Sequence, residues 1–355
     1  MNIPYRTRRF LNHLGIIGMI ALLILTVTWL CWVVWLERYV VYTRDGAVLD
    51  LEISANELTG EVAIPPEADS SSVSIYYNEG EDAVDSSSSL KQLDGYFISD
   101  KDLTNNIASA WEALDHLSSG TPVMIDLKGG YGSFYYHSNL SGAIASASVS
   151  TSSVDEIIKD MKEKGFYTIA RISAFRDYEY GRKNVSQGLM HINRKGLWPD
   201  EGGCYWLDPS QPAVINWICS MVNELKELGF DEVVLADFRF PAGESYIFTG
   251  DKDQTLNQAA ATIASNCVTN KFALSFCVNS TNFVLPAGRC RMYMEGVSAE
   301  NVGARTALLS LEEPQIRLVF IAETNDTRYN EYGVLRPIDA ADELEAQKIA
   351  MMGKS

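Results

Sequence analysis

The 355-residue sequence has few basic residues, four histidines, and six cysteines that follow no ligand spacing. Lysine and arginine number 29 against 46 aspartate and glutamate residues, which gives a formal net charge of -17. A surface of that sign repels phosphate backbones, so no nucleic-acid partner is expected. No CxxC and no histidine pair at metal-ligand spacing occurs, so we expect no metal site, no cofactor and no disulfide scaffold.

Several catalytic motifs are also missing. No GxSxG or HExxH occurs, and no GxGxxG follows a predicted strand. Serine-hydrolase, zinc-protease and dinucleotide-binding functions therefore lose support.

One long uncharged segment, residues 14–36, lies near the N-terminus. At about 1.5 Å per residue, a helix of this length crosses a hydrocarbon core of about 30 Å. Residues 1–13 contain three arginines, whereas only Arg38 follows the segment closely, so a cytoplasmic N-terminus is predicted. We expect residues 14–36 to be a single-pass anchor in the lipid bilayer of the cell membrane, with the C-terminal part extracellular. A cleaved signal peptide is the alternative.

The next segment, residues 37–92, is rich in acids and serine and has only short apolar runs. It is interpreted as an extracellular spacer with one hairpin, because residues 48–54 and 73–77 alternate as strands do. The last residues, 338–355, are expected to form a helix or a tail.

Between residues 93 and 337, short β-like runs alternate with helical patterns. Such alternation favours parallel strands covered by helices, and eight runs suit a closed barrel. The prediction is a (β/α)8 TIM-like barrel, with an open doubly wound sheet as the alternative. The eight runs are Gly95–Ser99, Val123–Leu127, Tyr167–Ser173, Glu232–Phe238, Phe272–Val278, Arg291–Glu295, Arg317–Glu323 and Tyr332–Leu335.

Three helices are predicted with particular cues. A capping box at Ser153–Glu156 starts one helix, which ends at Gly165. Pro212 lies in the first turn of another, which ends at Gly229. A third carries an apolar stripe through Ile107, Trp111 and Leu114.

In a barrel, the working groups come from the C-terminal ends of the strands. Those ends carry Asp126, Lys128, Arg171, Asp237, Arg239, Asn279, Glu295 and Glu323. Strands buried on both faces are otherwise apolar, so each ionisable group needs a partner or a cavity.

Asp237 is the most informative of these residues. Period 2 places it on one strand face with Val233 and Leu235, and places Ala236 on the opposite face against helices. Asp237 would then point into the barrel mouth, either as a nucleophile or charge stabiliser, or as a buried partner of Arg171 or Arg239.

The other candidates also have two interpretations each. Arg171 either orients a ligand or neutralises Asp126, and neutralisation is favoured. Glu295 and Glu323 each end an apolar run, either as a general acid or as a solvated strand terminus. Trp198, Tyr205 and Trp206 either stack on sugar rings or fill the core.

Three segments resemble one known family: VMIDLKGGYGSFYY, GFYTIARISAFRDYEYG, and YWLDPSQPAVINWICSMVNELKELGFDEVVLADFRFP. They are similar to the putative glycosyl hydrolase domain of bacterial surface proteins, a TIM barrel distantly akin to α-amylase-type glycosidases. The resemblance spans residues 93 to 337 and implies hydrolysis of a glycosidic bond by an acid and a facing carboxylate.

Residue by residue, the resemblance implies substrate-binding roles for Asp126, Lys128, Arg171, Trp206, Asp208 and Arg239. Ala236 occupies the position of the family's aspartate, and Asp237 follows one place later. The resemblance, the acids at the strand ends and the N-terminal segment together favour a membrane-anchored glycoside hydrolase acting on a polysaccharide or cell-wall glycan, with Asp237, Glu295 and Glu323 as candidate catalytic residues. The alternative is a catalytically inactive barrel that binds carbohydrate at the cell surface.

Overall fold

The computed structural model describes residues 90–341 continuously, and a smaller set of residues before them. The chain divides into two units, Met1–Glu79 and Gly80–Ser355. In the first unit the described positions are Met19, Leu22, Leu23, Leu25, Thr26, Thr28, Trp29, 40–43 and 46–49.

The first unit contains one described hairpin, in which β1 (Val40–Thr43) pairs antiparallel with β2 (Gly46–Leu49). Among the described residues, no helix is both long enough and apolar enough to cross a membrane. Most of the expected anchor (14–36) and spacer (37–92), and almost all of the expected C-terminal segment (338–355), lie outside the described residues. The predictions for these segments therefore stay predictions.

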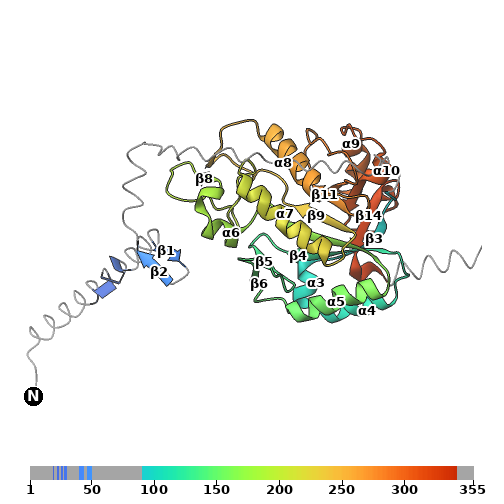
Figure 1. Ribbon diagram of the computed structural model, residues 1–355, viewed down its shortest axis with the longest axis horizontal. Helices are drawn as coiled ribbons and strands as arrows, with labels where there is room; N and C mark the ends of the chain where they lie inside the picture. The colour runs from blue at the N-terminus through green and yellow to red at the C-terminus, as the bar shows by residue number, and fades with distance from the viewer. Residues whose placement is uncertain are drawn as a thin grey trace, which may run out of the picture. The chain divides into compact units, whose positions relative to one another are not determined.

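The second unit is a closed barrel of eight parallel strands (Figure 1), as the sequence predicts. The last strand pairs with the first, so the short run predicted at 332–335 closes the barrel. The strands are β3 (Asp94–Ile98), β4 (Pro122–Lys128), β7 (Tyr167–Ser173), β9 (Glu232–Ala236), β11 (Ala273–Cys277), β12 (Met292–Glu295), β13 (Leu318–Ile321) and β14 (Gly333–Pro337).

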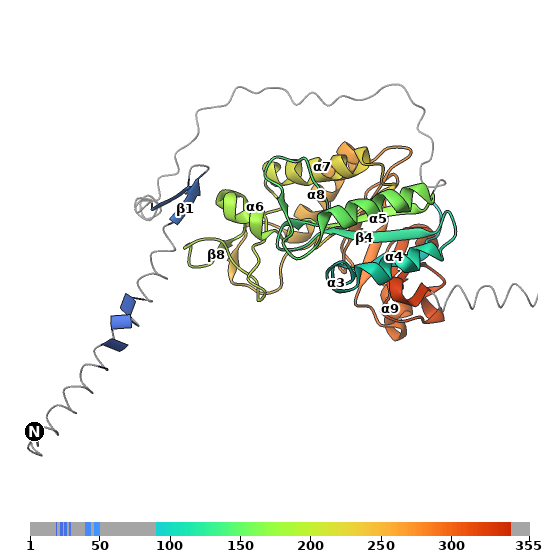
Figure 2. The same cartoon turned by 90° about the horizontal axis from the view of Figure 1, so that it is seen from below.

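Helices cover the barrel unevenly. The longer helices lie around the first half of the strands, while α9 and α10 are short (Figures 1 and 2). Residues 278–291, between β11 and β12, contain no helix, and β13 and β14 are joined by a single 3-10 turn. Strict βα alternation therefore fails in the second half. The helices are α3 (Asp100–Asn105), α4 (Ile107–Asp115), α5 (Thr151–Glu163), α6 (Tyr178–Lys183), α7 (Pro212–Glu227), α8 (Lys252–Cys267), α9 (Val302–Thr306) and α10 (Pro314–Arg317).

The helix boundaries test the sequence cues. Pro212 begins α7 as predicted. The prediction that Ser153 caps α5 is wrong, because Ser150 is the N-cap and its side chain accepts from the backbone N–H of Ser153. Gly165 follows the C-cap of α5 with φ +70°, a left-handed conformation that glycine adopts without strain.

Four short strands lie in the connections after β4, β7 and β9: β5 (Ser133–Phe134), β6 (Ile144–Ala145), β8 (Met190–His191) and β10 (Tyr246–Ile247). β8 pairs antiparallel with β10. α6 and β8 lie at one end of the barrel (Figure 1).

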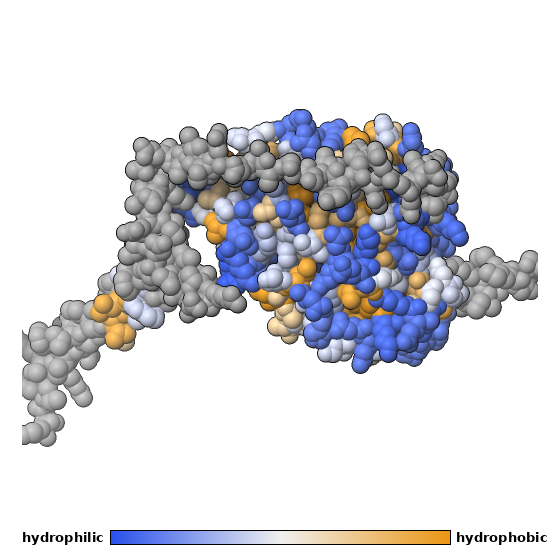
Figure 3. Space-filling model, viewed as in Figure 1, coloured by the Kyte–Doolittle hydropathy of each residue, from blue (hydrophilic) through white to orange (hydrophobic). Residues whose placement is uncertain are grey.

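Two apolar clusters form the core. One lies between the strands and the helices, and it includes the apolar faces of α5, α7 and α8. The other fills the barrel interior and consists of Leu93, Met124, Ile169, Val234, Cys277, Tyr293, Val319 and Leu335. By contrast, the surface over α4 and α5 is largely hydrophilic (Figure 3).

The N-terminal end of the barrel is closed by a buried ion pair between Glu232 and Arg291, both at most 1 % exposed. The hydroxyls of Ser275 and Tyr293 donate to one carboxylate oxygen at 2.6 and 2.9 Å, and the Tyr167 hydroxyl donates to the other at 2.9 Å. All these polar groups are satisfied, which a buried charge requires. This end of the barrel is therefore structural.

Candidate active site

The opposite, C-terminal end of the strands forms a polar rim. Its charged groups come from four strands or the residue after them, and they lie above the apolar interior cluster. They are Asp126 and Lys128 of β4, Arg171 of β7, Asp237 after β9 and Glu295 of β12. The rim unites five of the nine residues predicted for the site.

Arg171 is the centre of the rim. One of its terminal nitrogens donates to Asp126 at 2.7 Å and the other forms an ion pair with Glu295. The face of its guanidinium lies 5.4 Å from the ring centroid of Phe97. The favoured interpretation, that Arg171 neutralises Asp126, agrees with the ion pair between these two residues.

Burial and ion pairing oppose each other in the electrostatics of Asp126 and Arg171. The side chain of Asp126 is only 7 % exposed, and burial raises the pKa of this carboxyl although Arg171 pulls it down. Burial lowers the pKa of Arg171, but the charges of Asp126 and Glu295 outweigh it and raise that pKa. Arg171 therefore stays cationic at any physiological pH.

Lys128 forms a second, fully enclosed pair. Its ammonium lies 2.9 Å from the carboxylate of Asp177 and donates to the backbone carbonyl of Ser173 at 2.9 Å. The Lys128 and Asp177 side chains are 0 % and 1 % exposed, so the pair has no surface to offer a ligand. Asp177 also caps α6. Lys128 therefore joins β4, β7 and α6.

Asp237 points into the rim because of a backbone turn, which the alternation of side chains along β9 does not predict. Val233 and Leu235 belong to the outer cluster against the helices, so Val234 and Ala236 face the interior, the reverse of the predicted arrangement. β9 ends at Ala236, and Asp237 then adopts a left-handed backbone with φ +50°. This turn restores an inward position to a side chain that regular alternation would send outward.

The carboxylate of Asp237 is held from two sides. Oδ2 accepts a hydrogen bond from the hydroxyl of Ser173 at 2.7 Å, and Oδ1 lies 4.0 Å from a guanidinium nitrogen of Arg239. The Asp237 side chain is 26 % exposed and that of Arg239 is 51 % exposed. Asp237 therefore neither faces the helices nor is sealed from solvent.

An aromatic and charged group lies beside Asp237. The guanidinium of Arg239 is 4.7 Å from the ring centroid of Trp206, whose indole N–H donates to Asp200 at 3.1 Å. Arg176 donates to the same carboxylate at 2.6 Å. Trp206 is 2 % exposed, so it supports Arg239 rather than offering a free face to a sugar.

Two predicted residues lie elsewhere. Asp208 accepts from the backbone N–H and the hydroxyl of Ser210 at 2.9 and 2.7 Å, which fixes the turn before α7. Glu323 is exposed and lies two residues beyond the end of β13.

Cys277 ends the strand that lies between those leading to the two remaining candidate carboxylates, Asp237 and Glu295. β11, which ends at this residue, lies between β9 and β12 in the sheet. Burial raises the pKa of the Cys277 thiol well above its usual value, and the negative charges of Glu295 and Asp237 raise it further. Asp237, after β9, and Glu295, at the end of β12, therefore follow the two strands that flank β11.

Sequence reasoning missed Ser173 and Cys277. Arg171 and Ser173 are two residues apart on β7, so period 2 alone places the serine next to the arginine on the inner face. Cys277 ends an apolar run that gives no sign of polar neighbours.

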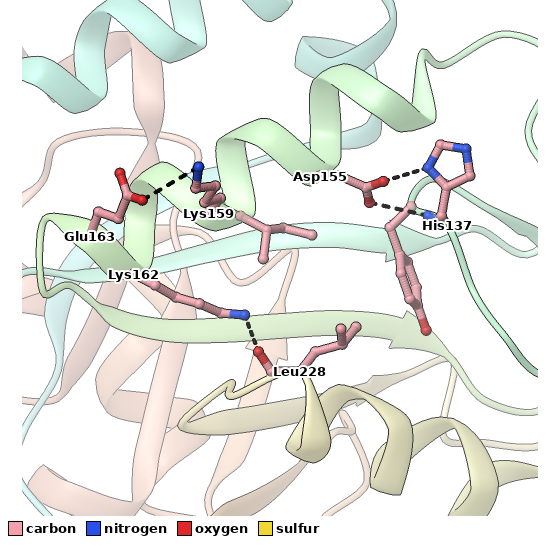
Figure 4. A pocket seen from close by; sticks show the side chains of 8 residues that line it. His137, Asp155, Lys159, Lys162, Glu163 and Leu228 are labelled. Carbon is pink, nitrogen blue, oxygen red and sulfur yellow. Dashed lines mark hydrogen bonds and ion pairs between the residues drawn. The ribbon is translucent and has the colours of Figure 1, made fainter.

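A cavity of about 350 Å³ lies outside the strands, along α5 (Figure 4). It is lined by Tyr136, His137, Asp155, Ile158, Lys159, Lys162, Glu163 and Leu228, and no rim residue lines it. Among residues the structure describes, no cluster of His, Cys, Asp and Glu could hold a metal ion.

The chain is similar to known proteins in one family and in several solved structures. Residues 100–275 match the family described as "Putative glycosyl hydrolase domain". No curated protein matches the chain. A hypothetical protein from Ruminiclostridium thermocellum ATCC 27405 is 20% identical over 51% of this chain and 96% of its own, with a TM-score of 0.44.

Two galactosidase structures are also similar. The alpha-galactosidase from Lactobacillus brevis is 12% identical over 75% of this chain and 41% of its own, with a TM-score of 0.47. The galactosidase domain of the alpha-galactosidase-sucrose kinase AgaSK is 14% identical over 74% of this chain and 40% of its own, with a TM-score of 0.50. The chain thus spans less than half the length of either. At these identities the likeness concerns the fold. The barrel fold and the family match agree, and residues 100–275 of this chain are similar to the putative glycosyl hydrolase domain family.

Proposed function

We propose that the chain is a glycoside hydrolase that cleaves a polysaccharide or cell-wall glycan, with Asp237 as nucleophile or charge stabiliser and Glu295 as general acid. The observation that carries this proposal is that the two carboxylates follow β9 and end β12, the strands on either side of β11, with side chains 26 % and 37 % exposed. Glycosidic bonds are cleaved by such a pair, one carboxyl protonating the leaving oxygen and the other acting on the anomeric carbon.

The remaining rim groups have supporting roles in this mechanism. Arg171 fixes Glu295 and neutralises Asp126, which keeps three buried or half-buried charges in place without a metal. Arg239, half exposed beside Asp237, is positioned to donate to sugar hydroxyls. Glu323 is not assigned a role, since it lies beyond the strand end and is exposed.

The test uses the purified full-length chain in detergent against a panel of soluble glycans and aryl glycosides. Asp237→Asn should lower kcat by about 10²–10⁴-fold, because an amide neither attacks nor carries charge. Glu295→Gln should lose most activity on natural glycans and least on aryl glycosides, whose leaving groups need no proton. Glu323→Gln is the matched control and should keep the wild-type rate.

Hydrolysis that survives in Asp237→Asn would contradict the assignment of Asp237. Equal losses in Glu295→Gln and Glu323→Gln would contradict the choice of Glu295.

A second function is favoured by one contact. One carboxylate oxygen of Glu295 is engaged by the guanidinium of Arg171, whereas a general acid needs an oxygen free to face the leaving group. A barrel that only binds carbohydrate would tolerate this pair. Glycan-array binding without release of reducing sugar would support the binding function, and turnover by the wild-type chain would exclude it.

We also propose that residues 14–36 anchor the chain in the cell membrane with the barrel outside. The uncharged segment and the arginines before it support this topology. Protease added to intact cells should digest an epitope at the C-terminus and spare one at the N-terminus. The opposite protection, or release of the chain from membranes by high salt alone, would contradict the proposal.

A further inference from the structure

Ser173, the last residue of β7, is held firmly by its backbone. It is 3 % exposed and lies opposite Ala236 in the parallel pairing of β7 with β9. Its carbonyl accepts from the buried ammonium of Lys128 at 2.9 Å, and the next amide, that of Ala174, donates to the carbonyl of Ala236 at 2.9 Å. Its hydroxyl therefore occupies a fixed position at the end of β9.

The hydroxyl has two acceptors within reach. Its Oγ lies 2.7 Å from Oδ2 of Asp237 and 2.8 Å from the backbone carbonyl of Arg176. A serine has a single proton to donate, and an ionised carboxylate is the stronger acceptor. The proton is therefore directed to Asp237, at the point where the chain has just left the strand.

Asp237 needs such a tether more than a residue within the strand would. Its backbone is left-handed, with φ +50°, so no strand pairing fixes the direction of its side chain. The neighbouring Phe238 is buried, with its ring centroid 4.7 Å from that of Phe175 and 4.8 Å from that of Phe276. Phe238 therefore anchors the backbone, while a hydrogen bond from β7 holds the carboxylate.

We propose that Ser173 is a positioning residue, whose hydroxyl fixes Oδ2 of Asp237 inside the rim and leaves Oδ1 directed to the mouth. The proposal rests on the role proposed above for Asp237. It explains how an aspartate displaced by one place in the sequence presents its carboxylate to the same site. Asp237 also interacts electrostatically with four other charged or titratable groups, which are Arg239, Arg176, Cys204 and Cys277.

The test compares Ser173→Ala with Ser275→Ala in the full-length chain. Ser275 is also a buried strand serine that donates to a carboxylate, Glu232, at 2.6 Å, but at the N-terminal end of the barrel. Ser173→Ala should lower kcat by about 10- to 100-fold with KM changed less than about 2-fold, because the tether acts on the reacting carboxylate.

Ser173→Thr should restore most of the loss, because threonine keeps the hydroxyl. Ser275→Ala should lower the melting temperature but leave kcat and KM as in the wild type. An unchanged kcat in Ser173→Ala, an equal loss of kcat in Ser275→Ala, or a folded Ser173→Thr with no rescue would overturn the proposal.

If the wild-type chain hydrolyses no glycan, the function proposed above fails, and the tether is then tested without turnover. The carboxyl carbon resonance of Asp237, identified by its loss in Asp237→Asn, is recorded by ¹³C NMR at pH 7. It should move in Ser173→Ala, which removes the hydrogen bond to Oδ2, and stay in place in Ser275→Ala. An unmoved resonance in Ser173→Ala would overturn the proposal whatever the activity.

Discussion

Replacing Arg291 by methionine should strongly destabilise the barrel without touching the rim. The variant keeps a side chain of similar length but leaves the carboxylate of Glu232 buried at 0 % exposure without its counter-ion. Breaking a buried pair in this way costs about 3–5 kcal/mol. Because three hydroxyls still donate to Glu232, we expect the lower end, about 3 kcal/mol.

That loss translates into a measurable shift. For a domain of this size, 1 kcal/mol corresponds to about 2–4 °C, so the melting temperature should fall by about 6–12 °C. Differential scanning calorimetry of the full-length chain at pH 7 measures it. The double variant Glu232→Gln with Arg291→Met should melt above Arg291→Met alone, because it removes the unpaired charge. The reasoning is refuted if Arg291→Met melts within about 2 °C of the wild type, or if the double variant melts lower still.

Three further predictions concern other parts of the molecule. Glu224→Ala should lower the free energy of unfolding by about 2–4 kcal/mol in urea titrations, because a tyrosine hydroxyl, a serine hydroxyl and a backbone N–H lose their shared acceptor; a loss below about 0.5 kcal/mol would contradict it. The side-chain hydrogen bond from Arg328 lowers the pKa of Asp326 to about 2; the pair therefore stabilises the fold above the ordinary carboxyl range and is lost as pH falls towards 2. NMR titration of Arg328→Gln should show the pKa of Asp326 raised towards 3.8, only in part because the backbone N–H of residue 328 still donates to it; an unchanged pKa would contradict this. Burial raises the pKa of Cys204 to about 11 and of Cys290 to about 12, so iodoacetamide at pH 8 should label neither in the native chain and both in urea, and rapid native labelling would show the thiols to be accessible.

The eight strands were predictable because each is buried on both faces. Such strands appear in the sequence as short apolar runs whatever their neighbours, and the runs at 95–99 and 332–335 are recognisable although they pair with each other across the whole length of the domain. The uneven helical cover was not predictable, since no sequence rule requires a helix in a connection that can be spanned by a loop.

Local conformation explains the errors at α5 and Asp237. Ser150 and Ser153 both precede the apolar stripe, and only the extended backbone at Ser150, with ψ 101°, decides which one caps. In the same way, alternation predicts the facing of a side chain only while the strand continues, and β9 stops one residue before Asp237.

The choice between Glu295 and Glu323 also depended on where strands end. Each follows an apolar run, so the sequence alone treats them alike. Glu295 lies within β12, two residues from the inward-facing Tyr293, whereas Glu323 lies two residues beyond β13. Pairing with Arg171 could not be read from the sequence, because the two residues are more than a hundred positions apart.

The apolar cluster in the barrel interior separates the N-terminal end of the strands from the C-terminal rim. Its members, from Leu93 to Leu335, fill the interior, so any ligand of the rim would enter and leave through the same opening. Changes near Glu232 and changes near Asp237 should consequently add without coupling. Substitutions at the C-terminal rim can therefore change the reaction while the N-terminal end keeps the fold stable.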